Sequence, residues 1–178
     1  GSEMCIRDSF EADPGCRGVG TDGFVIYYHP DYVCDLYKRG RVHVNRAYLH
    51  MVLHCLFCHM DTRGKRDAEL WNLACDIAVE SILDDMYVKC IRVAPTPFRR
   101  DWYGRLRGKL SVLNAEGVYR VLKEENLEPR RLERLEAEFL VDDHSYWDLP
   151  EDSPKTPIVR QTQWSNNREK VQTEMETM

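Results

Sequence analysis

The sequence predicts an α+β fold that is mostly α-helical, with a small sheet or an edge strand near residues 24–28. Two long segments, 45–60 and 67–86, carry apolar residues at helical spacing. A short run, Phe24 to Tyr28, is rich in the β-branched and aromatic residues that favour strands. The chain has 178 residues, and 43% of them are hydrophobic, which is enough for one domain with a buried core. We place this domain at residues 10–178.

The two ends of the chain are expected to differ from the rest of this domain. Residues 1–9 resemble translated sequencing-adapter read-through, so we predict a non-native leader there. Residues 142–163 contain three prolines and are predicted to form an irregular connection. The residues from Trp164 onward resemble the start of a helix with Ser165 as its N-cap, but no C-terminal signal follows. The natural protein is therefore expected to continue beyond Met178.

The first predicted elements are a turn, a strand and a short helix. Residues 21–23 have the sequence Thr-Asp-Gly, which favours a turn before the strand. Pro30 suits the first turn of a helix, so a helix is expected from Asp31 to Arg39, and Gly40 is predicted to end it. If the strand lies at the edge of a cleft, it can pair with an extended peptide by strand addition.

The two long helices are expected to form the centre of the domain. The first has Asn45 as its candidate N-cap and apolar residues on nearly every side, which is typical of a buried helix. Asp67 is the candidate N-cap of the second. Pro95 and Pro97 then interrupt the helical pattern. Three more modest helices are expected at residues 102–110, 115–125 and 129–140.

The composition argues against several classes of function. The 25 basic and 30 acidic residues give a net charge of -5, so no overall positive field attracts nucleic acid or an anionic membrane. No apolar run approaches the roughly 20 residues that cross a bilayer. The 7 cysteines are an odd number without regular close spacing, which fits a reducing compartment, so we expect a cytoplasmic protein. The partners that we expect are peptides or proteins.

His50 and His54 are the strongest candidate site residues. They stand four positions apart on a predicted helix, so both imidazoles can face one ion from adjacent turns. This spacing is the metal-binding half of the H-E-x-x-H motif. The alternative is a pair of core histidines that form hydrogen bonds to neighbouring groups. In so apolar a helix two unpaired imidazoles would be costly to bury, and Zn²⁺ would satisfy both together.

A zinc site with an open position for water needs a third protein ligand, for which the sequence offers two candidates. His59 lies five residues after His54, and it can join only if the helix bends or unwinds near Cys58. Asp76 lies on the second long helix beside small residues, and we favour it, although its row of polar residues would equally suit a solvated helix face. Cys55 and Cys58 form a lone C-x-x-C, which is a weak signal for a thiolate or redox site.

Three segments resemble one known family, the zincin-like metallopeptidase domain that precedes a von Willebrand factor A-like domain in bacterial proteins. The similar segments are Thr-Asp-Gly at 21–23, the histidine-containing helix at 46–59 and the helix at 70–80. The resemblance covers roughly residues 20–178 and implies a zincin-like helical core. It also implies a downstream von Willebrand factor A-like domain, which is missing from this chain. The family pattern is H-E-x-x-H-x-x-x-x-H followed by an A-x-D helix, and its metal-ligand positions are occupied here by His50, His54, His59 and Asp76.

One position departs from this pattern. Met51 stands where the family has glutamate, and methionine can neither accept a proton from water nor pass one to a leaving group. Loss of a general base typically costs about 10²- to 10⁴-fold in rate. Glu80, one turn beyond Asp76, is the candidate catalytic replacement. The run Asp-Asp-His at 142–144, followed by Trp147, also resembles the family, which implies a catalytic role for His144.

Three functions are compatible with this sequence. The first is a zinc-binding metallopeptidase-like domain with weak or absent peptide hydrolysis, and the second is a non-catalytic, metal-stabilised module that binds proteins. The third is a metal-dependent ribonuclease, because some bacterial RNA-processing enzymes bind zinc through histidines without the glutamate. A basic cluster more often marks a solvated helix face, so we expect no nucleic-acid partner. The cluster here consists of Arg99, Arg100, Arg105, Arg107 and Lys109.

Overall fold

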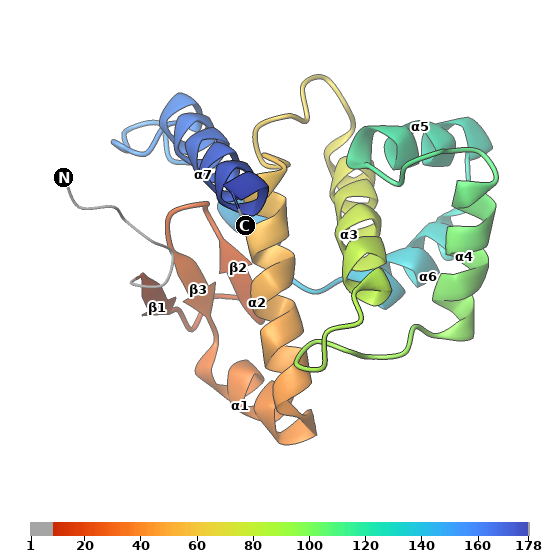
Figure 1. Ribbon diagram of the computed structural model, residues 1–178, viewed down its shortest axis with the longest axis horizontal. Helices are drawn as coiled ribbons and strands as arrows, with labels where there is room; N and C mark the ends of the chain where they lie inside the picture. The colour runs from red at the N-terminus through yellow and green to blue at the C-terminus, as the bar shows by residue number, and fades with distance from the viewer. Residues whose placement is uncertain (1–8, 178) are drawn as a thin grey trace.

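The computed structural model describes residues 9–177, which form a mostly helical α+β domain with one small sheet, as the sequence predicts (Figure 1). The leader predicted at residues 1–9 lies outside the described residues, except for Ser9. The strands are β1 (Phe10–Ala12), β2 (Val19–Thr21) and β3 (Ile26–Tyr28). The helices are α1 (Pro30–Arg39), α2 (Arg41–Leu56), α3 (Ala68–Asp85), α4 (Pro97–Arg107), α5 (Ala115–Glu125), α6 (Pro129–Phe139), the 3₁₀ helix η2 (His144–Trp147) and α7 (Pro157–Thr177).

The three strands form a sheet with β3 in the middle, parallel to β1 and antiparallel to β2. The predicted strand is confirmed as β3, although it is shorter than expected. Asp22 builds the turn before it, because its Oδ1 accepts the backbone N–H groups of Phe24 and Val25 at 2.8 and 2.9 Å. Both sides of β3 are paired, so the prediction that this strand lies at a cleft edge and pairs with a peptide is wrong. The sequence did not reveal β1 and β2, since three residues are too few for an alternating pattern.

The short helix α1 is confirmed, and Gly40 ends it with a φ of +143°. Helix α2 begins directly after this glycine instead of near residue 45. Asn45 is therefore not its N-cap, and its Nδ2 instead donates to the carbonyl oxygen of Cys90 at 2.9 Å. The helix ends at Leu56 rather than near residue 60, and Cys58 takes a positive φ of +54°. The residues after Leu56 thus leave the helical path.

Helix α3 begins where the sequence predicts. Asp67 is its N-cap, and its Oδ1 accepts the N–H of Leu70 at 2.9 Å. One side of α3 packs against α4, α5 and α6, which gives these three amphipathic helices a shared apolar core. The buried members of this core are Leu73, Ala74, Ile77, Trp102, Tyr103, Leu106, Leu110, Val118, Val121, Leu122, Leu135 and Phe139.

Two prolines begin helices where the sequence predicted interruptions. Pro97 is the first residue of α4, with Thr96 as its N-cap, because a proline loses no hydrogen bond in the first helical turn. Pro157 begins α7 in the same way. The irregular connection predicted at 142–163 is therefore shorter, since it contains η2 and gives way to α7 at residue 157. Ser165, the predicted N-cap, lies inside α7.

Helices α2 and α3 run through the middle of the molecule and contact each other (Figure 1). The sheet, α1 and α7 lie on the α2 side of this pair, and α4, α5 and α6 lie on the α3 side. Trp164 attaches α7 to the turn before β3, because its Nε1 donates to the carbonyl oxygen of Gly23 at 2.8 Å. No helix within residues 9–177 is both long enough and apolar enough to cross a membrane. The segment between α6 and α7 returns to the α2–α3 pair and brings distant residues together there.

Candidate metal centre

Helix α2 contributes two histidines to a buried polar cluster. His50 and His54 lie on the same face of the helix, because four residues span about one helical turn. Their Nε2 atoms are 2.8 Å apart, and the side chains are 0% exposed. The two imidazoles thus converge, as their spacing indicates.

Helix α3 contributes Asp76, whose carboxylate lies between the two helices. Its Oδ1 is 3.1 Å from Nε2 of His50 and 3.1 Å from Nε2 of His54. Asp76 is only 3% exposed, and the later members of its polar row, Glu80 and Asp84, are also buried. The alternative of a solvated helix face is therefore wrong for these residues, since the row faces α2.

The segment after α6 completes the cluster with Asp142 and His144. Oδ1 of Asp142 lies 3.0 Å from Nε2 of His50. Nε2 of His144 lies 3.0 Å from Oδ1 of Asp76 and 3.0 Å from Oδ1 of Asp142. All the ligand atoms lie within 4.8 Å of one another. We call these residues the histidine–aspartate cluster: His50, His54, Asp76, Asp142 and His144.

The sheet holds this last segment in place. The backbone N–H of Asp143 donates to the carbonyl oxygen of Val19 in β2 at 2.7 Å, and its carboxylate pairs with Arg17 at 3.1 Å. The ring of Tyr146 stacks on Tyr27 of β3 with centroids 4.5 Å apart. The segment therefore lies along the free edge of β2, which positions its two cluster residues against α2 and α3.

The cluster fits a divalent metal ion. Three imidazole nitrogens and two carboxylate oxygens are donors that Zn²⁺ and other first-row transition metals accept. If the imidazoles are neutral, the two carboxylates leave two negative charges in a buried site, and a divalent cation would balance them. Within residues 9–177, Oδ2 of Asp142 is buried without a hydrogen-bond partner. A buried carboxylate oxygen rarely lacks one, so the cluster suits a group that the chain itself does not supply.

The charges within the cluster shift the pKa values of its residues. Burial lowers the pKa of His144, but the carboxylates of Asp142 and Asp76 outweigh burial and raise this pKa to about 10. Burial likewise opposes protonation of His50, yet Asp142 and the other carboxylates hold its pKa well above the usual value. Burial raises the pKa of Asp76, whereas the neighbouring histidines, His144 first, lower it below its ordinary value. Protons would therefore compete with any bound metal ion for the same imidazoles.

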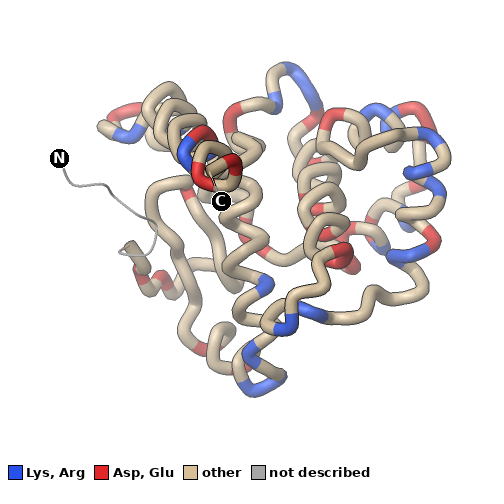
Figure 2. The backbone as a smooth tube through the Cα atoms, in the orientation of Figure 1, with Lys and Arg blue, Asp and Glu red and all other residues tan. Residues whose placement is uncertain are grey.

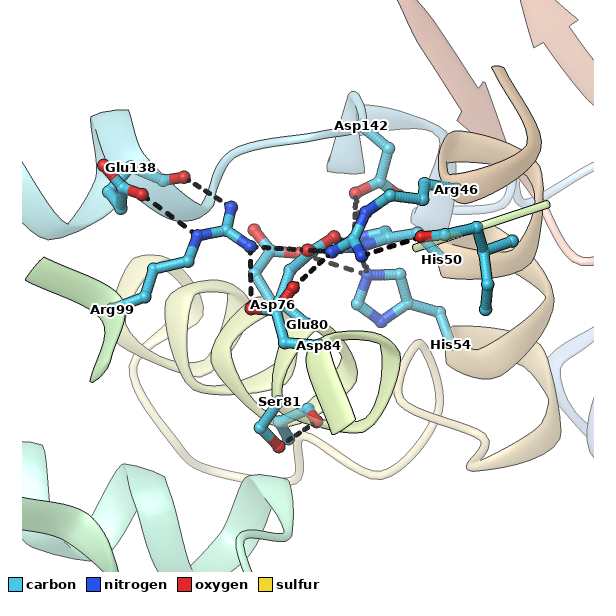
Figure 3. A network of polar contacts seen from close by, with 12 residues as sticks. Arg46, His50, His54, Asp76, Glu80, Ser81, Asp84, Arg99, Glu138 and Asp142 are labelled. Carbon is cyan, nitrogen blue, oxygen red and sulfur yellow. Dashed lines mark hydrogen bonds and ion pairs between the residues drawn. The ribbon is translucent and has the colours of Figure 1, made fainter. Parts of the chain in front are cut away.

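Glu80 contacts Nδ1 of His50, the ring nitrogen that does not face the cluster, and Figure 3 shows it between Arg46 and Arg99. Its Oε1 accepts the Nδ1–H of His50 at 2.8 Å, and its Oε2 accepts from Arg46 and Arg99 at 2.6 and 2.7 Å. Burial raises the pKa of Glu80, but the bond to His50 and the two arginines lower it to about 2. Glu80 thus fixes the tautomer in which Nε2 of His50 faces the cluster. Both of its oxygens are engaged, so this geometry does not favour the predicted role of Glu80 as a base.

A second group of buried charges adjoins the cluster and contacts it through His50 (Figure 3). We call it the arginine network, and it consists of Arg46, Glu80, Asp84, Arg99 and Glu138. Asp84 pairs with Arg46 at 2.7 Å and with Arg99 at 3.1 Å, and it accepts the hydroxyl proton of Tyr103 at 2.7 Å. Each carboxylate oxygen of Glu80 and Asp84 therefore has a partner from the protein.

His59 lies outside the cluster and contacts one of its members, His54. Because α2 ends at Leu56 and Cys58 has a positive φ, the chain turns His59 back beside His54. The Nδ1 atoms of His54 and His59 are 2.9 Å apart. Burial, followed by the charge of His54, lowers the pKa of His59 to about 2, which makes it an acceptor for the Nδ1–H of His54. His59 is not among the residues whose ligand atoms converge, and it supports His54 as Glu80 supports His50.

Met51 faces away from the cluster into apolar surroundings. It is 2% exposed, and a carboxylate in its place would enter this apolar environment without a partner. Cys55 and Cys58 pack in the same group, and burial raises the pKa of both thiols, so a thiolate site is not favoured there. The buried members of the group are Val19, Ile26, Leu36, Ala47, Met51, Cys55, Cys58 and Trp164.

A cavity of about 770 Å³ adjoins the cluster. Asp142, His144 and His59 line it, together with Trp147. The ring of Trp147 packs on two imidazoles of the cluster, with centroids 4.3 Å from His144 and 5.0 Å from His54. The volume lies in the range of sites that bind small ligands or peptide segments. A molecule in this cavity would therefore meet the cluster through Asp142 and His144.

The basic residues in and after α4 are interspersed with acidic ones. Figure 2 shows red and blue segments side by side over α4, α5 and α6. Arg99 belongs to the arginine network, and three further pairs lie at 2.8 to 3.0 Å. These pairs are Arg105 with Glu125, Lys109 with Glu125 and Arg107 with Asp85. This alternation is typical of a solvated helix face.

Sequence reasoning singled out four of the five cluster residues: His50, His54, Asp76 and His144. It missed Asp142, which stands in the same Asp-Asp-His run. In an extended segment, residues two apart point to the same side, so Asp142 could have been paired with His144. The intervening Asp143 points the other way, toward Arg17. The alternation in this run is the signal that would have identified the fifth residue.

The chain was compared with known protein families, curated proteins and solved structures. A family described as a putative metallopeptidase domain matches residues 3–170 of the chain. No curated protein and no solved structure matches the chain significantly. The matched range contains all the residues of the histidine–aspartate cluster and of the arginine network.

Proposed function

Because the chain belongs to the putative metallopeptidase domain family, we propose that it is a zinc-dependent hydrolase of peptide bonds with weak turnover. The observation that carries this proposal is the convergence of three imidazoles and two carboxylates beside a cavity. The cavity distinguishes the cluster from a metal site whose only role is to stabilise the fold, because a structural site is normally closed. We further propose a cytoplasmic location, which the free state of all six described cysteines supports.

The residues of the site have two roles: some bind the metal ion, and others orient the histidines that bind it. In the proposal, up to four of the cluster residues, the three histidines among them, hold Zn²⁺ and leave a position for water or substrate. Glu80 orients His50, and His59 orients His54. A bound zinc ion would polarise a substrate carbonyl group and lower the pKa of water. His144 thus serves as a ligand rather than as an acid or base. The substrate that we expect is a peptide or a protein, and the downstream von Willebrand factor A-like domain stays a prediction.

The expected rate of peptide hydrolysis is low because neither Met51 nor Glu80 offers a free carboxylate that could act as a general base. Met51 packs in an apolar group, and Glu80 is engaged by His50 and two arginines. Losing such a base typically costs about 10²- to 10⁴-fold. Slow hydrolysis would then depend on the metal and on the groups that bind the substrate.

Turnover of a casein or peptide substrate tests this function. The chain loaded with one equivalent of Zn²⁺ should hydrolyse the substrate slowly, and a chelator should stop the reaction until zinc is restored. The His50→Ala variant should be inactive under all conditions. As a matched control, His43→Ala removes a histidine from the same helix outside the cluster and should leave the rate unchanged. Turnover that survives the chelator, or that is absent with zinc bound, would contradict the proposal.

A second candidate function is a non-catalytic, metal-stabilised module for protein binding. The positions of Met51 and Glu80 favour it, because neither offers a free carboxylate to the cluster. This candidate predicts that zinc binds and stabilises the chain while no peptide is cleaved. The same turnover assay, combined with elemental analysis of the protein, separates the two functions.

A further inference from the structure

Arg160 of α7 is a buried arginine that binds three separate segments of the chain. It is 3% exposed, and a guanidinium group is costly to bury unless its N–H groups have partners. Its Nε donates to Oδ2 of Asp61 at 2.9 Å, and its Nη2 donates to the other oxygen of that carboxylate. Its Nη1 donates to the carbonyl oxygens of Asp22 at 3.0 Å and Trp147 at 2.9 Å. All three nitrogens of the guanidinium group thus bind oxygens of other segments.

Two of these segments carry residues of the metal centre. Asp61 lies two positions after His59, whose Nδ1 is 2.9 Å from Nδ1 of His54. The other segment is η2, whose last carbonyl oxygen accepts from Arg160 and whose first residue is His144 of the cluster. Neither histidine lies in a long helix, so each is positioned by the contacts that its segment makes with the rest of the chain. Arg160 therefore links a residue that supports one ligand to the segment that carries another.

Helix α7 is attached to the domain through few buried side chains. Of its residues, all of which the structure describes, only Arg160 and Trp164 are buried. Trp164 packs in the apolar group around Met51, and its indole N–H donates to Gly23 in the turn before β3, which carries no cluster residue. A helix in a protein gains most of its stability from packing. The contacts of these two residues thus decide whether α7 stays docked, and Arg160 is the one that binds η2.

We propose that Arg160 is a positioning residue that couples the docking of α7 to the metal centre. With α7 docked, the guanidinium group holds η2 and the residues after α2 where His144 and His59 serve the cluster. With α7 released, η2 loses this contact and His144 can move away from the other ligands. Any molecule that holds α7 away from the domain therefore lowers the affinity for zinc. The inference rests on the zinc site of the proposed function and adds a means of regulating it.

The chemistry of Arg160 suits positioning better than stabilisation. A buried ion pair adds little net stability compared with apolar residues of similar volume, because the cost of removing both charges from water offsets their attraction. A bidentate pair of arginine and carboxylate does, however, fix the direction of both groups. Linkage makes the coupling reciprocal, so bound zinc favours the docked state of α7 by the same factor by which docking favours zinc.

Calorimetric titration with zinc tests the positioning role in two variants of α7. Arg160→Met keeps an unbranched apolar stem but cannot donate to Asp61 or to η2. Arg168→Met is the matched control, because it removes the same charge from an exposed position of the same helix. Loss of outer contacts of a metal site typically costs about 10- to 100-fold in affinity. Because Arg160 acts through η2, we expect the Kd to rise about tenfold in Arg160→Met and to stay unchanged in Arg168→Met.

A second variant separates positioning from the stability of the fold. Arg160→Met leaves the carboxylate of Asp61 buried without a cation, which destabilises the chain. The double variant Asp61→Asn, Arg160→Met removes both charges together. Its Kd for zinc should still be raised about tenfold, because the contact with η2 is absent. A double variant that binds zinc as tightly as the unaltered chain would overturn the proposal.

Hydrogen exchange of the backbone amides of residues 160–164 gives a readout independent of affinity. Saturating zinc should slow this exchange up to about tenfold in the unaltered chain, because zinc favours docked α7. The double variant, also saturated with zinc, should show no such slowing. Equal slowing in both chains would mean that zinc acts on α7 without Arg160, and this result would refute the coupling.

The outcomes distinguish this inference from the proposed function. If the unaltered chain binds no zinc, the proposed function fails and the coupling fails with it. If the unaltered chain binds and uses zinc but Arg160→Met and Arg168→Met have the same Kd, the function stands and the role of Arg160 is refuted.

Discussion

Two groups of buried charges share the interface between α2 and α3, and they differ in what balances their carboxylates. In the arginine network, Glu80 and Asp84 are neutralised by the guanidinium groups of Arg46 and Arg99. In the histidine–aspartate cluster, Asp76 and Asp142 face only imidazoles, and one carboxylate oxygen has no partner. His50 joins the two groups, because its Nδ1 contacts Glu80 in the arginine network and its Nε2 contacts Asp76 in the cluster.

The two groups differ in the partners that surround their carboxylates, and these partners decide which group is left with room for a cation. The carboxylates of both groups come mainly from one face of α3 at four-residue spacing, so the helix alone does not distinguish them. The distinction comes from the partners that other elements supply. Arginine side chains from α2 and α4 complete one group, whereas imidazoles, which bind metals as neutral ligands, surround the other.

Met51→Glu should destabilise the chain most, because its carboxylate would be reached by neither a cation nor an arginine. The substitution would place this carboxylate in the apolar group around Cys55 and Trp164. We expect the free energy of unfolding to fall by more than about 4 kcal/mol, because an unpaired charge would be buried. Met51→Leu, which keeps the volume and the apolar character, should cost less than about 1.5 kcal/mol. Urea unfolding of both variants measures the difference. A Met51→Glu chain that stays stable and gains zinc-dependent peptidase activity would refute this account of position 51.

The second prediction concerns the stability contributed by the arginine network, in which arginines neutralise the carboxylates. Arg46→Ala leaves Glu80 and Asp84 short of a partner inside the protein and should cost about 3–5 kcal/mol, with or without zinc. Arg105→Ala breaks an exposed ion pair with Glu125 and should cost less than about 1 kcal/mol. Urea unfolding in the presence of a chelator measures both values. Equal losses would show that the buried pairs contribute no more than surface pairs.

A smaller effect tests the link between the two groups. Glu80→Gln should reduce the affinity for zinc about 10- to 100-fold, because the residue that fixes the tautomer of His50 loses its charge. Asp84→Asn is the matched control, since Asp84 pairs with the same two arginines without contacting His50. Calorimetric titration of both variants with zinc decides between the roles. If both lose the same affinity, the general loss of charge, rather than the contact with His50, is responsible.

The smallest effect is a dependence on pH. The pKa of Glu80 in the folded chain is about 2, below its usual value of 4.5, so its ionised form stabilises the fold. This contribution is present above about pH 4.5 and is lost as the pH falls toward 2. The stability of the unaltered chain should therefore decline more steeply over this range than that of Glu80→Gln. Parallel curves from acid titrations of the two chains would contradict the assignment.

The sequence predicted the helical scaffold well because helical signals are local. Asp67 as an N-cap, Gly40 as a helix end and the apolar spacing in α3 each depend on residues within a few positions. The strands β1 and β2 were missed because three residues carry too little pattern. Pro97 and Pro157 were interpreted as interruptions, although the position of a proline within the first turn makes it a helix start.

Only the site residues that share one helix could be brought together from the sequence. His50 and His54 share a face of α2, so their convergence follows from helical geometry. Whether Asp76 faces solvent or α2 depends on how two helices pack, which the sequence left open. Glu80 was expected at the cluster because it lies one turn from Asp76, yet the arginines from α2 and α4 hold it at Nδ1 of His50. Such long-range partners are set by tertiary packing.

We expect the histidine–aspartate cluster to hold one divalent cation, which can be measured by a zinc titration followed by elemental analysis. We predict one zinc ion per chain, with a stabilisation of about 2.7 kcal/mol when free zinc is one hundred times its Kd. The doubly substituted chain His50→Ala, His54→Ala should bind none and gain nothing. If the unaltered chain stays metal-free and unfolds at the same temperature in excess zinc, the account is contradicted.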